Sequence, residues 1–186
     1  MERDLEWKTL ASEYLIKDTW ATVRKDTCET SDGNIISPYY VYEFPDWVCA
    51  LAITKDGNVI LERQYRHALG ESGYEVPGGC VDATDKSYDD AIARELLEET
   101  GYQFEKYIFL GNTSANPSTN NNLMHLYLAT GGEKVAEQKL DDGEELEIVF
   151  ATIDQVKQML RNNQFIQSMH VACIMLALEK LGELKY

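Results

Sequence analysis

Residues 87–101 constrain the fold more than any other stretch of this 186-residue chain. Ser87 has the character of a helix N-cap, and Asp90 follows three residues later, as in a capping box. Gly101 is typical of the glycine that ends a helix in a left-handed conformation. The sequence therefore predicts a helix over residues 88–100.

The predicted helix has two chemically different sides. At about 100° per residue, Ile92 and Leu96 lie on one side. The opposite sector is shared by three acids, Glu95, Glu98 and Glu99. We expect the apolar side to pack on a sheet and the three carboxylates to face out. A solvated acidic face is the alternative, but carboxylates spaced i, i+3 and i+4 repel one another unless something positive lies among them.

A pair of glycines, Gly78 and Gly79, precedes this helix. Glycine is used where the backbone must approach a ligand closely. Hard cations such as Mg²⁺ take carboxylate and carbonyl oxygens, often together with substrate phosphates. Three carboxylates and a backbone carbonyl near Gly78 suit such a cation, so the acids are interpreted as a divalent-metal site.

The segment RELLEETGY, residues 94–102, resembles the end of the Nudix box, R-E-U-x-E-E-x-G-U, in which U is aliphatic. Every fixed residue of this pattern is present, and Tyr102 takes the last U position. The resemblance implies a Nudix hydrolase, which cleaves a nucleoside diphosphate linked to another moiety with Mg²⁺ or Mn²⁺. It also implies that Glu95, Glu98 and Glu99 bind the metal and that Arg94 orients a glutamate through a salt bridge.

The front of the box departs from the family pattern. Gly79 and Arg94 are fifteen positions apart, where the family has fourteen. Counting forward from Gly79 places the early acid of the box at Asp85, and counting back from Arg94 places it at Lys86. We infer a one-residue insertion in this loop, with Asp85 in place of the usual glutamate.

Outside the box the chain looks most like the ADP-ribose pyrophosphatases, which also accept other nucleoside diphosphate sugars. RQYR at residues 63–66 and YEVPGG at residues 74–79 resemble their motifs, and Pro117 lies close to the position of their marker proline. In the loop at residues 116–122, however, asparagines replace the acid expected there. The resemblance suggests four substrate-binding positions: Arg63, Arg66, Gly79 and Pro117.

The resemblance to the ADP-ribose pyrophosphatases implies that the general base is a glutamate in a loop late in the chain. DDGEELEI, residues 141–148, occupies that place. Glu144 is the first candidate and Glu145 the second, and the alternative is an ordinary exposed acidic turn. If neither Glu144 nor Glu145 is the base, the base is expected on the helix, with Glu95 as the first candidate. Arg94 is counted among the catalytic residues because it is expected to orient a glutamate.

The rest of the chain predicts an α/β fold, a Nudix-type α/β/α sandwich around a mixed sheet with a small N-terminal β unit. Residues 47–66 read as a hairpin around an Asp-Gly turn. The predicted boundaries are 1–45 for the β unit and 46–186 for the Nudix hydrolase domain. Further strands are expected at 39–44, on both sides of 31–34, within 72–82, and at 106–115, 123–130 and 146–151; further helices are expected at 153–160 and 165–181.

Composition excludes several function classes. A formal charge of −15 gives the chain no electrostatic reason to bind a nucleic-acid backbone. No apolar run approaches the roughly 20 residues that span a bilayer, and the N-terminal sequence lacks a signal-peptide pattern. The cysteines form no metal-binding or disulfide pattern, so we expect reduced thiols and a cytoplasmic protein. His67 and His125 are expected to be structural.

Residues 1–45 are too few for a core of their own, so we expect them to pair in a homodimer and to cover the substrate, as in the subfamily. Aromatic side chains are candidates for core or interface packing, with stacking on a nucleobase as the alternative: Trp20, Tyr39, Tyr40 and Trp47.

The sequence thus predicts Mg²⁺-dependent hydrolysis of the diphosphate bond of ADP-ribose or a related nucleoside diphosphate sugar. The products are a nucleoside monophosphate and a sugar phosphate. A Nudix hydrolase of another nucleotide, such as a GDP-sugar or a nucleoside triphosphate, is one alternative. A non-catalytic Nudix-like sensor that binds a nucleotide and regulates a partner is the other.

Overall fold

The computed structural model describes residues 3–19, 21–141 and 143–184. Its chain divides into two compact units. Unit 1 contains Met1–Pro45 together with Ser114–Asn122, and unit 2 contains Asp46–Thr113 and Leu123–Tyr186. The segment from Ser114 to Asn122 is distant in sequence from the rest of unit 1, and its placement there was not predicted.

Unit 1 is built on an antiparallel sheet of three strands, β1 (Lys8–Lys17), β2 (Thr22–Glu29) and β3 (Ile35–Glu43), in that order. The strands β2 and β3 confirm the pair predicted around residues 31–34. The strand β1 was not predicted, and its side chains are exposed along its whole length. The Tyr39 hydroxyl donates to the Ser118 carbonyl at 2.7 Å, which ties β3 to the second segment of the unit.

Unit 2 contains a mixed sheet of seven strands within the part of the chain that the structure describes. A hairpin of β4 and β5 forms its centre, and β4 pairs with β9 in the sheet's parallel ladder. The strand β5 also pairs with β10 and β6, and β9 pairs with β8 and β7. The bounds are β4 (Trp47–Thr54), β5 (Val59–Arg66), β6 (Glu71–Glu75), β7 (Tyr102–Gln103), β8 (Lys106–Thr113), β9 (Met124–Lys134) and β10 (Leu146–Ala151).

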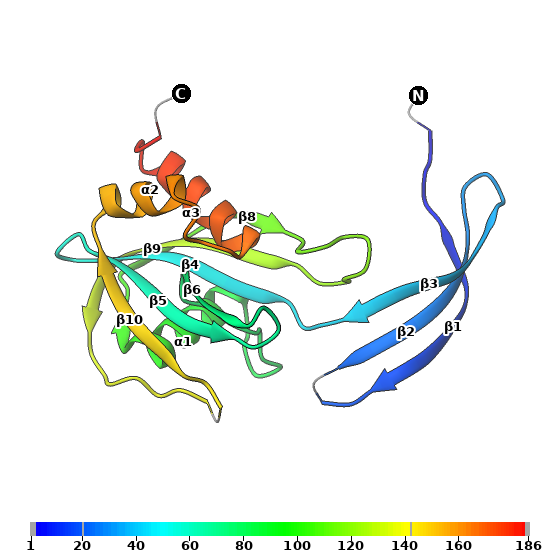
Figure 1. The fold of residues 1–186 in the computed structure, drawn as a ribbon, viewed down its shortest axis with the longest axis horizontal. Coiled ribbons are helices and arrows are strands. Elements are labelled where there is room, and N and C mark those ends of the chain that lie inside the picture. The colour runs from blue at the N-terminus through cyan, green and yellow to red at the C-terminus, as the bar shows by residue number, and fades with distance from the viewer. Residues whose placement is uncertain (1–2, 20, 142, 185–186) are drawn as a thin grey trace. The chain divides into compact units, whose positions relative to one another are not determined.

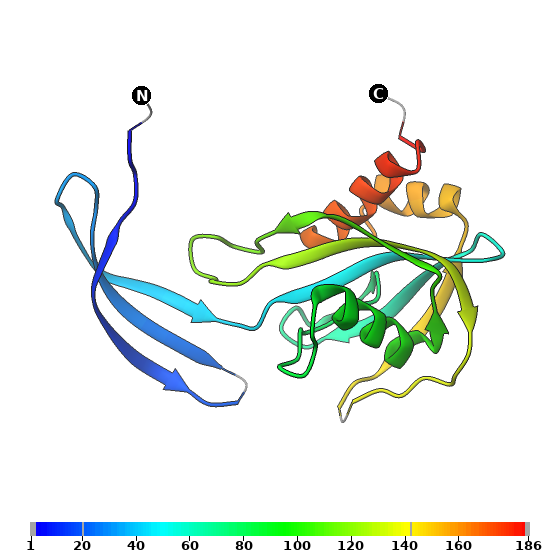
Figure 2. The same cartoon turned by 180° about the vertical axis from the view of Figure 1, so that it is seen from behind.

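Helices cover both faces of this sheet, which confirms the predicted α/β/α sandwich (Figure 1). The helices α2 (Ile153–Arg161) and α3 (Ser168–Lys180) lie on one face, and α1 (Tyr88–Thr100) lies on the other, as Figure 2 shows from behind. The prediction that the last helix begins at Phe165 is wrong, because Phe165 precedes the helix and forms an isolated bridge with Tyr74. Among the described helices, none is long and apolar enough to cross a membrane.

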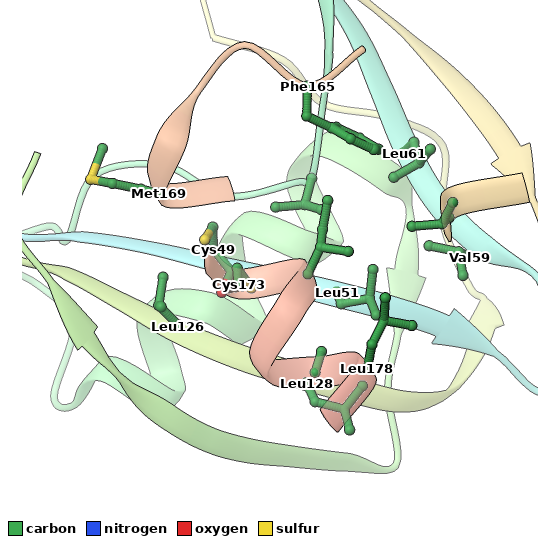
Figure 3. Close-up of a cluster of buried hydrophobic side chains, with 14 of the residues drawn as sticks. Cys49, Leu51, Val59, Leu61, Leu126, Leu128, Phe165, Met169, Cys173 and Leu178 are labelled. Atoms are coloured by element: carbon green, nitrogen blue, oxygen red, sulfur yellow. Dashed lines mark hydrogen bonds between the residues drawn. The ribbon is translucent and has the colours of Figure 1, made fainter. Parts of the chain in front are cut away.

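The two faces of the sheet carry separate apolar clusters. The larger cluster lies between the sheet and α3, where Phe165, Cys173 and Leu178 meet Leu51 and Leu61 (Figure 3). The smaller cluster lies under α1, and its members are Val48, Ala50, Ala52, Ile60, Ala91, Ile92, Leu96, Phe104, Tyr127 and Ala129. The predicted apolar side of α1 therefore packs on the sheet as expected.

Candidate active site

The helix α1 is fixed at both ends by the signals that predicted it. The Ser87 hydroxyl oxygen accepts the Asp90 amide at 3.1 Å, and Gly101 closes the helix with φ 74°. Its burial pattern, with Ile92 and Leu96 fully covered, sets the rotation of the helix on the sheet. This rotation decides where each of the three acids lies.

Glu99 does not face out, so the predicted orientation of the three carboxylates is wrong for this residue. Its side chain is 7% exposed, and its Oε2 accepts the Gly78 amide at 2.7 Å. The loop that carries the glycines folds over this turn of α1 and covers the carboxylate. Glu95 and Glu98 remain half-buried beside it.

The two glycines are required by close approach. A Cβ on Gly79 would lie 2.7 Å from the Glu95 carboxyl carbon. A Cβ on Gly78 would lie 2.1 Å from the Val48 carbonyl oxygen, and its φ of 149° also favours glycine. Gly79 therefore lets the loop backbone lie against the Glu95 carboxylate, whereas the sequence predicted close approach to a ligand. Its contact with substrate and a metal-binding carbonyl at Gly78 stay predictions.

Arg94 lies at the centre of an ion-pair network. Its guanidinium donates two hydrogen bonds to Asp85, at 3.0 and 2.9 Å, and lies 3.0 Å from both Glu95 and Glu98. It also donates to the Cys80 carbonyl at 2.9 Å. Arg94 thus joins the loop to the acidic side of the helix, in keeping with its predicted salt bridge to a glutamate.

Asp85 is the fixed partner of Arg94. The hydrogen bonds from Arg94 hold the pKa of the Asp85 carboxyl below its usual range, and the same contacts raise the pKa of Arg94. Asp85 also accepts the Asp82 amide at 2.8 Å, which closes a short turn. The aspartate that stands at the front of the box therefore reaches Arg94, and the predicted one-residue insertion stays a prediction.

The remaining carboxylates repel one another in a poorly hydrated place. Burial raises the pKa of Glu95 to about 7, opposed by Arg94 and reinforced by the charges of Glu98 and Glu144. Burial also raises the pKa of Glu99 well above its usual value, with further contributions from Glu62, Glu95 and Glu144. Arg94 and Arg66 are the arginines near these carboxylates, and the acids around them are more numerous than the two positive charges.

Glu144 lies in the late loop, where its Oε2 accepts the Asp141 amide at 3.1 Å. Its charge acts on both Glu95 and Glu99, although its own side chain is exposed. The loop is anchored upstream, where the Gln138 side-chain Nε2 donates to the Glu99 backbone carbonyl at 2.7 Å and the Lys139 backbone amide donates to the Glu98 backbone carbonyl at 2.8 Å. Glu145 is also exposed. The catalytic roles of Glu144 and Glu145 stay predictions.

The predicted substrate-binding residues are dispersed. Arg66 is bidentate to Glu75, with both hydrogen bonds at 2.7 Å, and it remains half-exposed. Arg63 is exposed and lies 3.6 Å from Glu147. Pro117 belongs to unit 1 and is exposed. Within unit 2, Gly79 lies against the Glu95 carboxylate, and Arg66 is hydrogen-bonded to the buried carboxylate of Glu75.

Two buried carboxylates of this region, Glu62 and Glu75, were not predicted as part of the site. They face each other across the β5–β6 ladder, at 3% and 6% exposure. Buried His170, whose pKa burial lowers to about 4, lies 3.5 Å from Glu75. The burial of Glu62 could have been predicted from the sequence, because the alternation of side chains along a strand places Glu62 on the same side as apolar Ile60.

The histidines and aromatic side chains named from the sequence differ in their surroundings. His125 lies 3.2 Å from Asp46 and stacks on Tyr88, in keeping with a structural role, whereas His67 is exposed. Trp47 packs against the larger apolar cluster and Tyr40 is exposed. Trp20 lies outside the described residues.

The donor set fits a hard divalent cation. Within residues 3–19, 21–141 and 143–184, no three acidic, His or Cys side chains already surround a common metal position. The available groups are nevertheless carboxylates that repel one another, and the buried Glu62 Oε1 has no hydrogen-bond partner among the described residues. Oxygen donors with uncompensated negative charge are the ligands that Mg²⁺ and Mn²⁺ take.

Comparison with known families decides the assignment. The NUDIX domain matches residues 44–169. The chain belongs to the Nudix family. The Nucleoside diphosphate sugar hydrolase N-terminal domain matches residues 7–42, which include the three strands of unit 1 up to Tyr42. The protein is therefore a Nudix pyrophosphohydrolase, as the resemblance of residues 94–102 to the Nudix box implied.

Similar proteins point to the same subfamily. The chain is 27% identical to a Methanol dehydrogenase activator of Bacillus methanolicus, over 94% of each protein. It is 26% identical to an ADP-ribose pyrophosphatase of Bacillus subtilis (strain 168), over 87% of each. The fold also matches a solved ADP compounds hydrolase with a TM-score of 0.84 and 23% identity, over 98% of this chain and all of that one. The predicted resemblance to the ADP-ribose pyrophosphatase subfamily is confirmed.

Proposed function

We propose that this Nudix enzyme hydrolyses the diphosphate bond of ADP-ribose or of a related nucleoside diphosphate sugar. The products are a nucleoside monophosphate and a sugar phosphate. The observation that carries the proposal is the carboxylate cluster of α1 against the glycine loop, together with the match to the Nucleoside diphosphate sugar hydrolase N-terminal domain. The printed name of the Bacillus subtilis relative supports ADP-ribose as the first substrate to test.

The metal is proposed to be Mg²⁺, with Mn²⁺ as the alternative, held by Glu95, Glu98 and Glu99 and by a carbonyl near Gly78. When bound, the cation neutralises diphosphate charge and polarises phosphorus. Arg94 holds the Glu95 and Glu98 carboxylates on the site side of the helix, since it lies 3.0 Å from each.

Glu144 is the proposed general base, because its charge already reaches Glu95 and Glu99. Its carboxylate would take a proton from the attacking water, and Glu145 and Glu95 are the second and third candidates. Arg66 and Arg63 are proposed to contact substrate, together with Gly79 and Pro117. For Arg66 this requires a substrate oxygen to share the guanidinium with Glu75.

A homodimer is proposed from the composition of unit 1. Its three-stranded sheet exposes large apolar side chains that a second copy can cover. They are Trp7, Leu10, Tyr14, Leu15, Ile16, Ile35, Tyr40 and Tyr42. Light scattering at micromolar concentration should give twice the monomer mass, and a monomer would refute the proposal.

A cytoplasmic location is proposed as well, supported by four free cysteines, of which Cys28, Cys49 and Cys173 are buried.

A second candidate function is regulation of a partner enzyme by a nucleotide-bound Nudix protein. The relative named Methanol dehydrogenase activator is the observation that favours it. The two candidates differ in turnover, because a sensor binds its nucleotide without consuming it.

The test is incubation of the protein with a panel of nucleoside diphosphate sugars, GDP-sugars and nucleoside triphosphates in Mg²⁺, followed by phosphatase-coupled phosphate release. ADP-ribose or another nucleoside diphosphate sugar should give the highest kcat/KM. Preference for a triphosphate would overturn the substrate class, and tight binding of ADP-ribose without turnover would support the sensor.

A further inference from the structure

Three buried carboxylates meet at the end of the smaller apolar cluster: Glu62 on β5, Glu75 on β6 and Glu99 on α1. Glu62 and Glu75 are direct cross-strand partners, an arrangement that is destabilising for like charges. The charge of Glu62 also acts on Glu99, where it helps to raise the pKa of the Glu99 carboxyl beyond the effect of burial. A fold gains nothing in stability from placing three acids together, so each needs its own explanation.

Two of the three have partners. Glu75 accepts two hydrogen bonds from the Arg66 guanidinium, both at 2.7 Å, and lies 3.5 Å from His170. Glu99 accepts the Gly78 amide at 2.7 Å. The Arg66 charge attracts Glu62 as well, but the guanidinium is already bonded to Glu75.

Glu62 is the exception. Its side chain is 3% exposed, and within the described part of the chain its Oε1 has no hydrogen-bond partner. A buried, unsatisfied carboxyl oxygen costs free energy, and native structures rarely keep one without a function or an additional partner. An aliphatic residue at this position of β5 would continue the apolar pattern of Val59, Ile60 and Leu61.

The position of Glu62 indicates what the missing partner is. Strand alternation places Glu62 on the α1 face, the same face as Ile60, and the charge of Glu62 acts there on Glu99 of α1. The charge of Glu144 also acts on it. Burial raises its pKa to about 8, in line with a carboxyl that lacks a positive neighbour of its own. A cation between these groups would satisfy all of them.

We propose that Glu62 is a further ligand of the divalent cation, contributed by the sheet to the carboxylates of helix α1. The inference rests on the proposed function, because it extends the metal site of the same hydrolase. It gives the sheet, as well as helix α1 and the glycine loop, a part in holding the metal. A ligand on a central strand fixes the depth at which the cation lies.

The test is Mn²⁺ alone, titrated by calorimetry into metal-free protein without substrate. Glu62→Gln keeps the shape of the side chain and removes its charge, and Glu147→Gln on β10 makes the same change at an exposed position. We expect Glu62→Gln to weaken Mn²⁺ binding by about 10- to 100-fold or more, the range known for groups that support metal ligands. Glu147→Gln should bind like wild type, and equal affinity of all three proteins would overturn the proposal.

A second measurement separates direct ligation from support of Glu99. Electron paramagnetic resonance in ¹⁷O-water counts the water ligands of bound Mn²⁺. Glu62→Ala should add a water ligand relative to wild type, and an unchanged count would overturn direct ligation. Thermal unfolding of each metal-free variant checks that it is folded.

The outcome is independent of the substrate panel. Wild type that binds Mn²⁺ through Glu62 but hydrolyses no nucleotide would sink the proposed function alone. Hydrolysis by wild type with unchanged Mn²⁺ affinity in Glu62→Gln would sink the inference alone.

Discussion

The two faces of the unit 2 sheet use the same strands for different purposes. On β5, Val59 and Leu61 enter the larger apolar cluster under α2 and α3. Ile60 enters the smaller apolar cluster under α1, and the next side chain on that face is Glu62. On the first face the β5 side chains are apolar, whereas on the second an apolar side chain is followed by a buried carboxyl.

The difference shows how stability and chemistry are separated in this fold. Apolar burial contributes roughly 25 cal/mol per Å², so the larger cluster is the main source of stabilisation. The acidic end of the α1 face opposes folding through desolvation and repulsion until a cation compensates it. Substitutions on the two faces should therefore have opposite signatures.

The largest expected effect concerns the late loop next to the acidic face. Glu144→Gln should lower kcat by about 10²- to 10⁴-fold with little change in substrate affinity, because a general base acts on water in the transition state. Steady-state kinetics with ADP-ribose measure this, and Glu145→Gln is the matched control. A silent Glu144→Gln beside a defective Glu145→Gln would move the base by one residue. If both are silent, the base lies on α1, with Glu95 first.

The second effect concerns the helix acids. Glu98→Gln and Glu99→Gln should each lower turnover by about 10²- to 10³-fold, the usual cost of losing an electrostatic stabiliser. Stability should hold or rise, since each change relieves like-charge repulsion. Activity assays and thermal unfolding are compared with Glu179→Gln, an exposed glutamate on α3. Wild-type rates in both variants would mean that these acids bind no catalytic metal.

The opposite signature is expected from the apolar face. Leu61→Ala should lower the free energy of unfolding by about 2–5 kcal/mol, because it opens a cavity beside Phe165 and α3. Activity per folded molecule should stay near wild type. Chemical denaturation measures the loss, with Leu69→Ala in an exposed turn as control. A small loss in Leu61→Ala, equal to that of Leu69→Ala, would contradict the assignment of stability to this face.

The smallest effect is a pH dependence of the metal-free protein. Glu62 and Glu95 have folded pKa values of about 8 and about 7, above the 4.5 of an unperturbed glutamate. The folded state therefore holds protons that the unfolded chain has lost, and stability falls as pH rises from 6.5 to 8.5. His170, with a folded pKa of about 4, affects only lower pH. The expected loss is on the order of 1 kcal/mol for Glu62, measured by denaturation, and a flat profile would contradict it.

The sequence predicted the elements whose signals are local. The cap at Ser87 and the glycine at Gly101 were enough to place α1 at its observed bounds, and the Asp-Gly turn placed the β4–β5 hairpin. The strand β1 was missed because its side chains are exposed throughout, so it lacks the alternation that marks a half-buried strand.

The site was predicted only where one element carries it. The helix acids and Arg94 follow from spacing on α1, but the burial of Glu99 depends on a loop twenty-one residues away. Glu62 and Glu75 meet through strand pairing, and Arg66 is bound by Glu75 across the same ladder. Such contacts depend on the register between neighbouring strands, which cannot be predicted from a short stretch of sequence.

The most direct test of the cation site is the unfolding free energy of the metal-free protein with and without Mn²⁺. Wild type should gain about 2.7 kcal/mol when Mn²⁺ is present at 100 times its dissociation constant, because the cation binds the folded state. Glu99→Gln should gain much less at the same concentration, although its metal-free form is at least as stable as wild type. Equal stabilisation of the two proteins, or none of wild type, would contradict the account.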